Sequence, residues 1–287
     1  MLQYFLEETK HSVFEQNRLP QLLYLCNTET MRQNFPRVLH KHDDRLEIVF
    51  IVKGSGSHLI GNTRYQTKAG DILIFNRGVI HDEMAEVNSD MVVYCCGIKN
   101  LQIKGMEENC LFDMLSPAVI ASGDKRELIE KTLDTMFLYV RDNLAAANEN
   151  CRYLLASLLT TIIRLPREKI KPISYKRLTL VEQVKHYIDQ HYQEELTLQD
   201  IALRFNVSPY YLAHLFKEQT NFSPIQYMIR RRIGEAQSLL INTNHSVTRI
   251  ASLVGYDNAN YFSTLFSKMI GISPSSYRTS WIGKNSK

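Results

Sequence analysis

The strongest constraint on how this chain folds is a repeat within roughly its last hundred residues. The pair Ile201-Ala202 recurs as Ile250-Ala251 after 49 residues, whereas the pattern Tyr-x-x-x-Leu-Phe that begins at Tyr211 recurs after 50. The extra residue therefore falls between the two patterns, where a turn accommodates an insertion best. Each arm has the apolar spacing of a short helix, a tight turn and a second helix, which is typical of a helix-turn-helix. Because such a unit places its second helix in the major groove of DNA, the tandem repeat makes DNA recognition the leading hypothesis.

The second helix of each arm is expected to have one buried and one exposed face. Ser208 before Pro209 predicts a helix N-cap followed by proline at the first helical position, and Asp257 or Asn258 is the matching cap in the other arm. Apolar residues at helical spacing should face inward: Leu212, Leu215, Phe216, Phe262, Leu265 and Phe266. The side chains left outside are the candidates for base edges and phosphates: Tyr210, Ala213, His214, Lys217, Asn258, Asn260, Ser263 and Thr264. Two helical hairpins with solvated faces are the alternative, and the matched repeat favours DNA binding.

A single long helix is predicted between the two arms. Residues 224–241 carry one apolar stripe, with a start signal at Ser223-Pro224 and an end signal at residues 242–244. At a rise of 1.5 Å per residue, this helix would be roughly 27 Å long and could hold two recognition helices about one DNA turn apart. Arg230, Arg231 and Arg232 lie at its middle and cannot all face the core, so we expect phosphate contacts from this run.

These motifs resemble the DNA-binding domain of AraC/XylS regulators over residues 178–280. The resemblance rests on two sets of residues: Ile201-Ala202, Ser208, Leu215-Phe216-Lys217, Ser223-Pro224, Tyr227 and Ala236 in the first half; and Ile250-Ala251, Val254-Gly255-Tyr256, Tyr261-Phe262, Gly271, Ser273-Pro274 and Tyr277-Arg278 in the second. It implies a seven-helix domain that binds asymmetric sites across two adjacent major-groove segments, with Tyr210, His214, Asn260 and Thr264 as base readers. Many family members carry a longer side chain where Thr264 stands, so base reading by the second arm is the weaker expectation.

The N-terminal half is predicted to form an antiparallel β-barrel or sandwich, because short β-rich runs alternate with glycine-containing turns. The expected strands are residues 22–26, 46–52, 58–60, 72–75 and 91–96. The spacing from His40-x-His42 through Glu47 to Gly54 resembles the first cupin motif. The spacing from Gly70 to His81 resembles the second, with Asn76 in place of its proline. The fold class is therefore α+β: a cupin-like barrel with a helical pair, then an all-α domain with two helix-turn-helix motifs.

Four residues of the cupin-like pattern are candidate ligand-binding residues: His40, His42, Glu47 and His81. Side chains at positions i and i+2 of a strand point to one side, so His40 and His42 can both face the barrel interior. In cupin enzymes these residue types hold one divalent metal, whereas regulators of the AraC family usually keep the pattern without metal. Both interpretations stay open, and a pocket for a small polar effector without metal or other cofactor is favoured. Some of four aromatic residues are expected to line that pocket, with packing in the core as the alternative for each: Tyr24, Phe50, Phe75 and Tyr94.

Helical spacing recurs in residues 124–142 and 149–165, with Asp124 and Asn148 as expected caps. In the family such a pair often carries dimer contacts, so a homodimer is expected; packing within one chain is the alternative. The charged segment from Pro166 to Pro172 predicts an interdomain linker. We therefore expect a sensing and dimerisation domain at residues 1–165, a linker at 166–177 and a DNA-binding domain at 178–287.

The charge distribution agrees with this division. Residues 172–287 hold 13 lysines and arginines against 8 aspartates and glutamates, whereas residues 1–171 hold 21 against 22. A positive balance on the C-terminal half favours phosphate attraction. No apolar run is long enough to span a membrane and no signal peptide is evident, and the five cysteines lack a Cys-x-x-Cys spacing, so a cytoplasmic protein with reduced cysteines is expected.

The favoured function is a sequence-specific transcriptional regulator, by family habit an activator, that binds double-stranded DNA and responds to a small-molecule effector. A carbohydrate is a candidate effector and RNA polymerase a further candidate partner. The alternative is a metal-dependent cupin enzyme fused to a DNA-binding domain. The sequence offers that alternative no catalytic base or nucleophile beyond the four possible ligands, so no catalytic residue is assigned.

Overall fold

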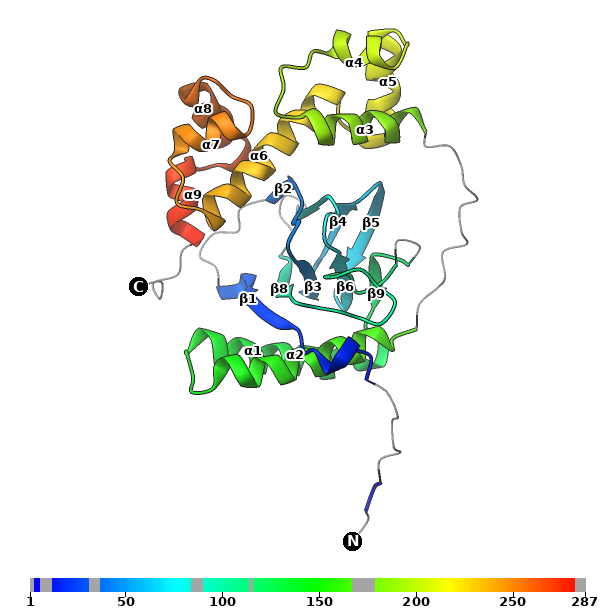
Figure 1. The fold of residues 1–287 in the computed structure, drawn as a ribbon, viewed down its shortest axis with the longest axis vertical. Coiled ribbons are helices and arrows are strands. Elements are labelled where there is room, and N and C mark those ends of the chain that lie inside the picture. The colour runs from blue at the N-terminus through cyan, green and yellow to red at the C-terminus, as the bar shows by residue number, and fades with distance from the viewer. Residues whose placement is uncertain are drawn as a thin grey trace.

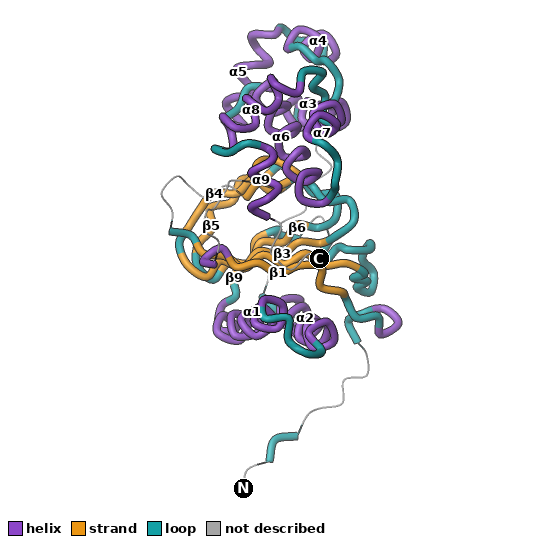
Figure 2. Tube along the Cα trace, turned by 90° about the vertical axis from the view of Figure 1, so that its left-hand side faces the viewer, coloured by secondary structure: helices purple, strands orange, loops and turns teal. Residues whose placement is uncertain are grey.

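The computed structural model describes residues 3–5, 12–30, 37–83, 90–113, 116–166 and 179–281. These residues stack in four layers, which Figures 1 and 2 show from two directions. A helical pair covers one face of a five-stranded sheet, a four-stranded sheet covers the other face, and the C-terminal helices lie beyond the four-stranded sheet. The barrel is therefore enclosed by helices on two sides.

The barrel consists of two antiparallel sheets. The five-stranded sheet has the order β1 (Gln21–Asn27), β8 (Val92–Lys99), β3 (Leu46–Lys53), β6 (Asp71–Phe75) and β9 (Val119–Ala121). The four-stranded sheet has the order β2 (Arg37–His40), β7 (His81–Glu83), β4 (Ser55–Ile60) and β5 (Thr63–Lys68). This arrangement confirms the cupin-like barrel and all five expected strands. The four strands not expected are β2, β5, β7 and β9, which are short or carry many polar residues.

Strand β3 shows why the larger sheet is buried on both faces. Val49 and Ile51 face the barrel interior, where they pack with residues such as Phe75 and Cys95. Leu46, Ile48 and Phe50 point the other way, toward the helical pair. Because alternate side chains leave a strand on opposite faces, a strand covered on both sides reads as one continuous apolar run.

The helical pair is α1 (Arg126–Arg141) and α2 (Ala147–Ile163). Its inner face contributes Ile129, Leu133, Met136, Leu155 and Leu159 to the core below the five-stranded sheet. The two expected caps were wrong. The N-cap positions are Lys125 and Ala146, and neither side chain caps its helix, because residues 123–125 form a 3₁₀ turn that leads into α1 and Ala146 takes a left-handed conformation.

The C-terminal domain contains seven described helices, as expected. They are α3 (Leu180–His191), α4 (Leu198–Arg204), α5 (Pro209–Thr220), α6 (Pro224–Asn242), α7 (Val247–Leu253), α8 (Ala259–Ile270) and α9 (Pro274–Trp281). Helices α4 and α5 form the first helix-turn-helix and α7 and α8 the second. The turn of the second arm, residues 254–258, is one residue longer than that of the first, residues 205–208, which is where the repeat predicted the insertion. Most of the linker expected at residues 166–177 lies outside the described residues.

Helix α6 joins the two arms and also packs directly on the barrel, where β2 lies beneath it (Figure 1). Val38 packs in the core of the second arm and Leu39 in that of the first. A Cβ atom on Gly234 of α6 would lie 2.0 Å from the carbonyl oxygen of Leu39, so this contact requires glycine. Among the helices that the structure describes, none is long and apolar enough to cross a lipid bilayer.

Candidate nucleic-acid interface and sensor cluster

The two recognition helices, α5 and α8, begin with side-chain caps. The Ser208 hydroxyl accepts a hydrogen bond from the backbone N–H of Tyr211, and Pro209 follows as the first helical residue. In the second arm the Asn258 side chain accepts from the N–H groups of Asn260 and Tyr261, so Asn258 and not Asp257 is the cap. Leu212 and Phe216, like Phe262 and Phe266, are fully buried, as the helical spacing predicted.

Most of the candidate DNA contacts lie on the exposed face of these helices. The exposed residues are Tyr210, His214, Lys217, Asn258, Asn260 and Thr264, whereas Ala213 and Ser263 are half-buried. Tyr210 is 83% exposed, so its ring and hydroxyl are accessible to a binding partner. The hydroxyls of Ser263 and Thr264 donate to backbone carbonyls one turn earlier in α8. The second arm therefore presents shorter side chains than the first.

Sequence reasoning missed two exposed tyrosines on these helices. Tyr211 is 52% exposed and Tyr261 is 59% exposed, and they occupy equivalent positions in the two arms. The repeat itself holds the signal, because both residues begin its Tyr-x-x-x-Leu-Phe pattern while only the leucine and phenylalanine turn inward.

Two of the three arginines expected to contact phosphate are buried in the protein. The Arg231 side chain is fully buried; its Nε donates to Asp189 at 3.1 Å and its Nη1 to the carbonyl of Leu39 at 2.9 Å. Arg232 donates to the backbone carbonyls of Tyr192, Glu194 and Gly255. These hydrogen bonds connect α6 to the segments that follow α3 and α7. The expectation was wrong for both, because helical periodicity turns these positions toward the barrel and the domain core.

Arg230 is half-buried, with its guanidinium 4.2 Å from the centre of the Phe222 ring. Burial lowers the pKa of Arg230, while the nearby Asp82 carboxylate of the barrel raises it. A phosphate contact from Arg230 stays a prediction.

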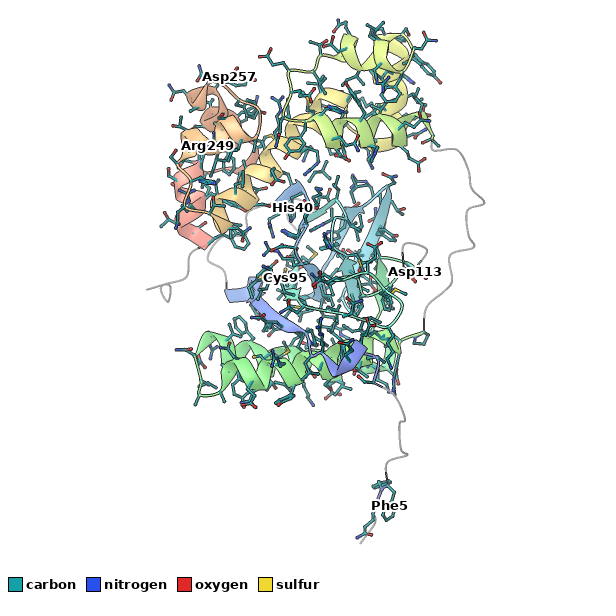
Figure 3. The ribbon with its side chains drawn as sticks, in the orientation of Figure 1. Phe5, His40, Cys95, Asp113, Arg249 and Asp257 are labelled. Carbon is teal, nitrogen blue, oxygen red and sulfur yellow. The ribbon has the colours of Figure 1, made fainter. Side chains whose placement is uncertain are left out.

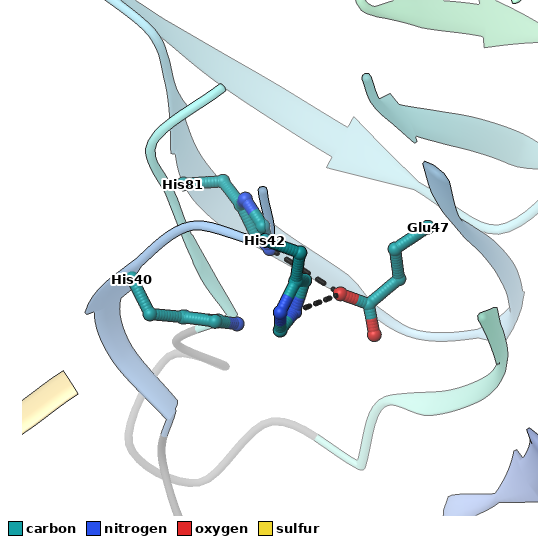
Figure 4. Close-up of side chains that lie close together, drawn as sticks. All are labelled: His40, His42, Glu47 and His81. Atoms are coloured by element: carbon teal, nitrogen blue, oxygen red, sulfur yellow. Dashed lines mark hydrogen bonds and ion pairs between the residues drawn. The ribbon is translucent and has the colours of Figure 1, made fainter. Parts of the chain in front are cut away.

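The four residues of the cupin-like pattern converge inside the barrel. Figure 4 shows the three imidazole rings and the Glu47 carboxylate pointing toward one another from β2, the segment after it, β3 and β7. One ligand atom from each of the four residues can be chosen so that all lie within 4.8 Å of one another, and every one of the four is at most 7% exposed. The clustering predicted from the spacing is therefore present at one end of the barrel, on the side of the DNA-binding domain (Figure 3).

The two carboxylate oxygens of Glu47 have different environments. Oε2 lies 3.0 Å from Nε2 of His42 and 3.4 Å from Nε2 of His81. Oε1 accepts hydrogen bonds from the Tyr24 hydroxyl at 2.8 Å and the Cys95 thiol at 2.7 Å, and it lies 3.7 Å from the Arg37 guanidinium. Oε2 is thus the oxygen that faces the imidazoles.

Protonation follows from this environment. Burial lowers the pKa of His40 well below its ordinary value, and it also lowers that of His42 despite the opposing hydrogen bond to Glu47. Burial alone would raise the pKa of Glu47, but the hydrogen bonds from His42 and His81 and the charge of Arg37 hold it well below its ordinary value. At neutral pH the cluster therefore combines an ionised carboxylate with neutral rings at His40 and His42, which are the forms that bind metal ions.

A cavity of about 230 Å³ lies elsewhere in the barrel, between the β4–β5 turn and the loop before β9. Its lining includes Ile60, Tyr65, Asn76, Val79, Phe112 and Ala118. The Asn76 amide donates to the carbonyl of Phe112, and its oxygen accepts from the N–H of Leu111. Asparagine at the position of the motif proline therefore fixes a loop at the cavity wall.

Two of the four aromatic residues considered for the pocket lining face the barrel interior, and the other two do not. Phe50 and Tyr94 point toward the helical pair, where the Tyr94 hydroxyl donates to Asp134 of α1. Tyr24 and Phe75 do face the barrel interior, and the Phe75 ring stacks on His81 with ring centres 3.8 Å apart. Strand alternation separates the two pairs onto opposite faces of one sheet.

Together, an enclosed antiparallel barrel and a tandem helix-turn-helix joined by one helix define a two-domain regulator. Comparison with known proteins agrees: residues 23–101 match the family model of the AraC-like ligand binding domain, and residues 201–280 match that of a helix-turn-helix domain. The chain belongs to the AraC family of helix-turn-helix transcriptional regulators.

Three relatives illustrate the similarity. The chain is 31% identical over 245 residues to the HTH-type transcriptional regulator YdiP of Escherichia coli (strain K12), with 83% of this chain and 80% of the relative covered. It is 24% identical to the HTH-type transcriptional activator RhaR of Mannheimia succiniciproducens, with 97% and 99% covered. It is 26% identical to the lactose operon transcription activator of Staphylococcus xylosus, with 79% and 81% covered.

Proposed function

We propose that this protein activates transcription by binding one asymmetric DNA site with both helix-turn-helix arms, under the control of an effector held in the barrel. The observation that carries the proposal is that α6 joins both arms and also contacts β2, the strand that bears His40. With 19 residues, α6 is roughly 28 Å long, somewhat shorter than the roughly 34 Å of one DNA turn, so it can hold the two recognition helices about one turn apart. Because the proposed partner of the protein is DNA, we propose that the protein acts in the cytoplasm.

The experiment is a selection of binding sites from random duplexes, followed by footprinting of the full chain. The expected footprint covers two adjacent major-groove segments with unrelated sequences. Equal protection of every duplex, whatever its sequence, would contradict the proposal.

The first arm is proposed to carry most of the base reading. Tyr210 and His214 project from the exposed face of α5, and Lys217 one turn later is placed for a phosphate. In the second arm Asn258, Asn260, Ser263 and Thr264 are the candidates, of which Asn260 has the longer exposed side chain whose amide can pair with a base. Ala213, half-buried, would offer an apolar contact to a thymine methyl group.

The effector is proposed to be a small polar molecule, with His40, His42, Glu47 and His81 as its candidate binding residues. All four lie within the segment that matches the AraC-like ligand binding domain. A relative is named as a lactose operon activator, so carbohydrates are the first class to test. A thermal-shift screen should find a stabilising sugar, and His42→Ala or His81→Ala should abolish the shift while leaving DNA binding nearly intact. A Val79→Phe variant, which narrows the separate cavity, is the control. If the sugar-induced thermal shift is lost in Val79→Phe but not in the histidine variants, the effector binds in the cavity and not at the four-residue cluster.

A homodimer is proposed through the outer face of the helical pair. Leu128, Leu138 and Val140 of α1 and Tyr153 of α2 are exposed by 39% to 57%, and such exposed apolar side chains are candidates for contact with a second copy of the chain. Sedimentation of the wild type and of a Leu128→Glu variant tests this proposal, and a wild-type monomer at micromolar concentration would contradict it. RNA polymerase is a further proposed partner, as expected for an activator.

The second candidate function is a metal-dependent cupin enzyme fused to a DNA-binding domain, and the convergence of four potential ligands favours it. All four residues would be ligands, so a catalytic base would have to come from elsewhere in the barrel. Since the relatives are regulators, we infer a regulatory rather than catalytic role. Turnover of a candidate substrate by metal-loaded protein would overturn this inference.

A further inference from the structure

Strands β1 and β8 place two cysteines directly opposite each other. In their antiparallel register Cys26 of β1 pairs with Cys95 of β8; Cys95 belongs to the apolar cluster inside the barrel, and Cys26 packs against that cluster. We propose that these two thiols form a reversible intrachain disulfide on exposure to a peroxide, and that this bond removes a hydrogen bond from Glu47. The inference goes beyond the proposed function, because it makes oxidation an input to the barrel that is separate from the effector.

The strand register places the two sulfur atoms within reach of each other. Residues directly opposite in an antiparallel pair have their side chains on the same face of the sheet, with Cβ atoms about 4.5–5.5 Å apart. A disulfide needs a Cβ–Cβ distance of about 3.5–4.5 Å, so the two strands need to approach by about 1 Å. Strand β1 can make this movement, because it is the edge strand of its sheet and its pairing with β8 already shifts register between Leu22 and Tyr24.

The other three cysteines, which also lie in the described part of the chain, are less well placed for this reaction. Cys96 follows Cys95 in β8 and therefore points to the opposite face of the sheet, so these two neighbours cannot join without distortion. Cys96 and Cys151 both lie in the core beneath the helical pair, where exposures of 1% and 2% shield them from an oxidant. Cys110 is half-buried and lies in a loop rather than opposite a cysteine on a strand.

Their different exposure gives the two paired cysteines different steps. Cys26 is half-buried on the edge strand, so hydrogen peroxide can reach its sulfur, whereas Cys95 is buried. The Cys26 thiolate attacks one peroxide oxygen, the O–O bond breaks, and uptake of a proton leaves a sulfenic acid and one water. The Cys95 sulfur then attacks the Cys26 sulfur, the S–O bond breaks, and the departing hydroxide takes the Cys95 proton to form a second water. Two thiols are thus oxidised to one disulfide while the peroxide is reduced to water.

The disulfide also changes the environment of Glu47. In the reduced protein the Cys95 thiol donates to Glu47 Oε1 at 2.7 Å, beside the Tyr24 hydroxyl at 2.8 Å. A sulfur in a disulfide has no hydrogen to donate, and it must turn about the Cα–Cβ bond of Cys95 toward β1, so Oε1 loses this donor. The other carboxylate oxygen faces His42 and His81. Oxidation on the edge strand therefore reaches the proposed effector residues through one side chain.

The first experiment maps the bond. Reduced full-length protein is treated with an equimolar amount of hydrogen peroxide, the remaining thiols are alkylated, and the digested protein is analysed by mass spectrometry. One intrachain disulfide between Cys26 and Cys95 is expected, and dithiothreitol should reverse it. Cys110→Ser is the matched control, because Cys110 is half-buried like Cys26 but lies in a loop, and this variant should form the same bond. A disulfide between any other pair, or none at all, would overturn the proposal.

The second experiment tests the order of the two steps. Cys95→Ser should stop at the sulfenic acid of Cys26, which dimedone labels. In Cys26→Ser the Cys95 thiol should be lost at least about tenfold more slowly than in the wild type, because burial limits access of the oxidant. Loss of the Cys95 thiol at the wild-type rate in Cys26→Ser would contradict the assignment of Cys26 as the residue that is attacked first.

The third experiment tests the connection to Glu47 by NMR of protein with ¹⁵N-labelled histidines. Oxidation should shift the imidazole resonances of His42 in the wild type, and Cys95→Ala, which removes the donor without a disulfide, should shift them in the same direction. Peroxide should leave these resonances unchanged in Cys26→Ser. Unshifted resonances in wild-type protein whose disulfide has been mapped would contradict the connection.

Binding of the reduced protein to a selected DNA site separates the possible failures. Loss of sequence preference contradicts the proposed function, whereas specific DNA binding by a protein that forms no disulfide between Cys26 and Cys95 contradicts only this inference.

Discussion

At the scale of single residues, the amino-acid type alone did not determine what a side chain contacts. Three consecutive arginines of α6 have three different environments: Arg230 is half-buried over an aromatic ring, Arg231 is fully buried between the domains, and Arg232 caps backbone carbonyls. Helical periodicity turns neighbours by about 100°, so adjacent residues point to different partners. The exposed residues of the recognition helices are the ones free to meet DNA.

The first prediction concerns base reading by α5. Tyr210→Ala and His214→Ala should each lower the preference for the cognate first half-site by about 1–3 kcal/mol, because these side chains project away from the buried Leu212 and Phe216 face. Competitive gel shifts with cognate and scrambled duplexes measure this preference. An unchanged ratio of specific to non-specific binding in His214→Ala would refute its base-reading role.

The second prediction separates a structural from a phosphate-binding arginine. Arg231→Ala should destabilise folding by about 2–3 kcal/mol, because the Leu39 carbonyl loses its guanidinium donor and Asp189 loses its ion pair, although Asp189 retains the hydrogen bond from the Tyr227 hydroxyl. Burial already raises the pKa of Asp189 despite the charge of Arg231, so protonation of Asp189 limits the loss. Urea unfolding measures the effect. Arg204→Ala, an exposed control in α4, should leave stability unchanged.

The third prediction is a pH dependence at the contact between the sheet and α1. Burial, together with the hydrogen bond to Asp134, raises the pKa of Tyr94 to about 12. A raised folded-state pKa contributes stability that is complete below the unfolded value of about 10 and disappears as the pH rises through 12. In urea unfolding, the difference between the wild type and Tyr94→Phe should therefore shrink from pH 9 to pH 11.5. A constant difference would contradict this assignment.

At the scale of elements, the two helix-turn-helix arms share one plan but cap their recognition helices differently. Ser208 caps α5 and leaves its exposed face to other residues, whereas Asn258 caps α8 and also lies at the proposed DNA surface. The second arm thus combines folding and recognition in one side chain.

The fourth prediction uses that double role. Asn258→Asp keeps an oxygen cap and should retain stability, but its negative charge should weaken DNA binding at least tenfold by repelling phosphate. Asn258→Ala should lose about 1 kcal/mol of stability and weaken DNA binding less. Ser208→Ala is the matched control, losing a similar amount of stability with a smaller effect on DNA. If Asn258→Asp binds DNA as the wild type does, Asn258 lies away from the phosphates.

At the scale of the whole molecule, the barrel and the DNA-binding helices are joined by specific contacts as well as by the chain. Lys185 of α3 donates to the carbonyl of Gly61 and to Asn62 Oδ1 at the β4–β5 turn, and β2 packs under α6. In the second arm the start of the recognition helix lies away from the barrel, as the position of Asp257, in the turn before α8, shows in Figure 3.

The fifth prediction tests modularity at this scale. A fragment beginning near Tyr175, within the segment outside the described residues, should fold and bind DNA without any effector, because the apolar core of the two arms is nearly complete without the barrel. The fragment should be less stable than the same domain within the full chain, since Val38 and Leu39 of the barrel no longer cover α6. Circular dichroism and footprinting measure both properties. A helix-poor spectrum would show that the barrel is needed for folding.

The sequence by itself determined the class of each domain and most of the recognition surface. The repeat, its caps and its apolar spacing are local patterns, and local patterns fix helices such as α5 and α8 and the faces they bury. The spacing around His40, His42, Glu47 and His81 likewise predicted their clustering, because alternation along strands and pairing between them are regular.

Only the tertiary structure decided what lies between the domains. The burial of Arg231 and Arg232, the glycine contact at Gly234 and the position of Phe50 and Tyr94 on the outer face of the barrel sheet all depend on which surfaces meet. The contacts between the barrel and α6 join residues nearly two hundred positions apart, such as Val38 and Gln237, and no short-range pattern in the chain encodes them. A periodicity states which residues share a face, whereas the partner of that face is chosen by the packing of the whole molecule.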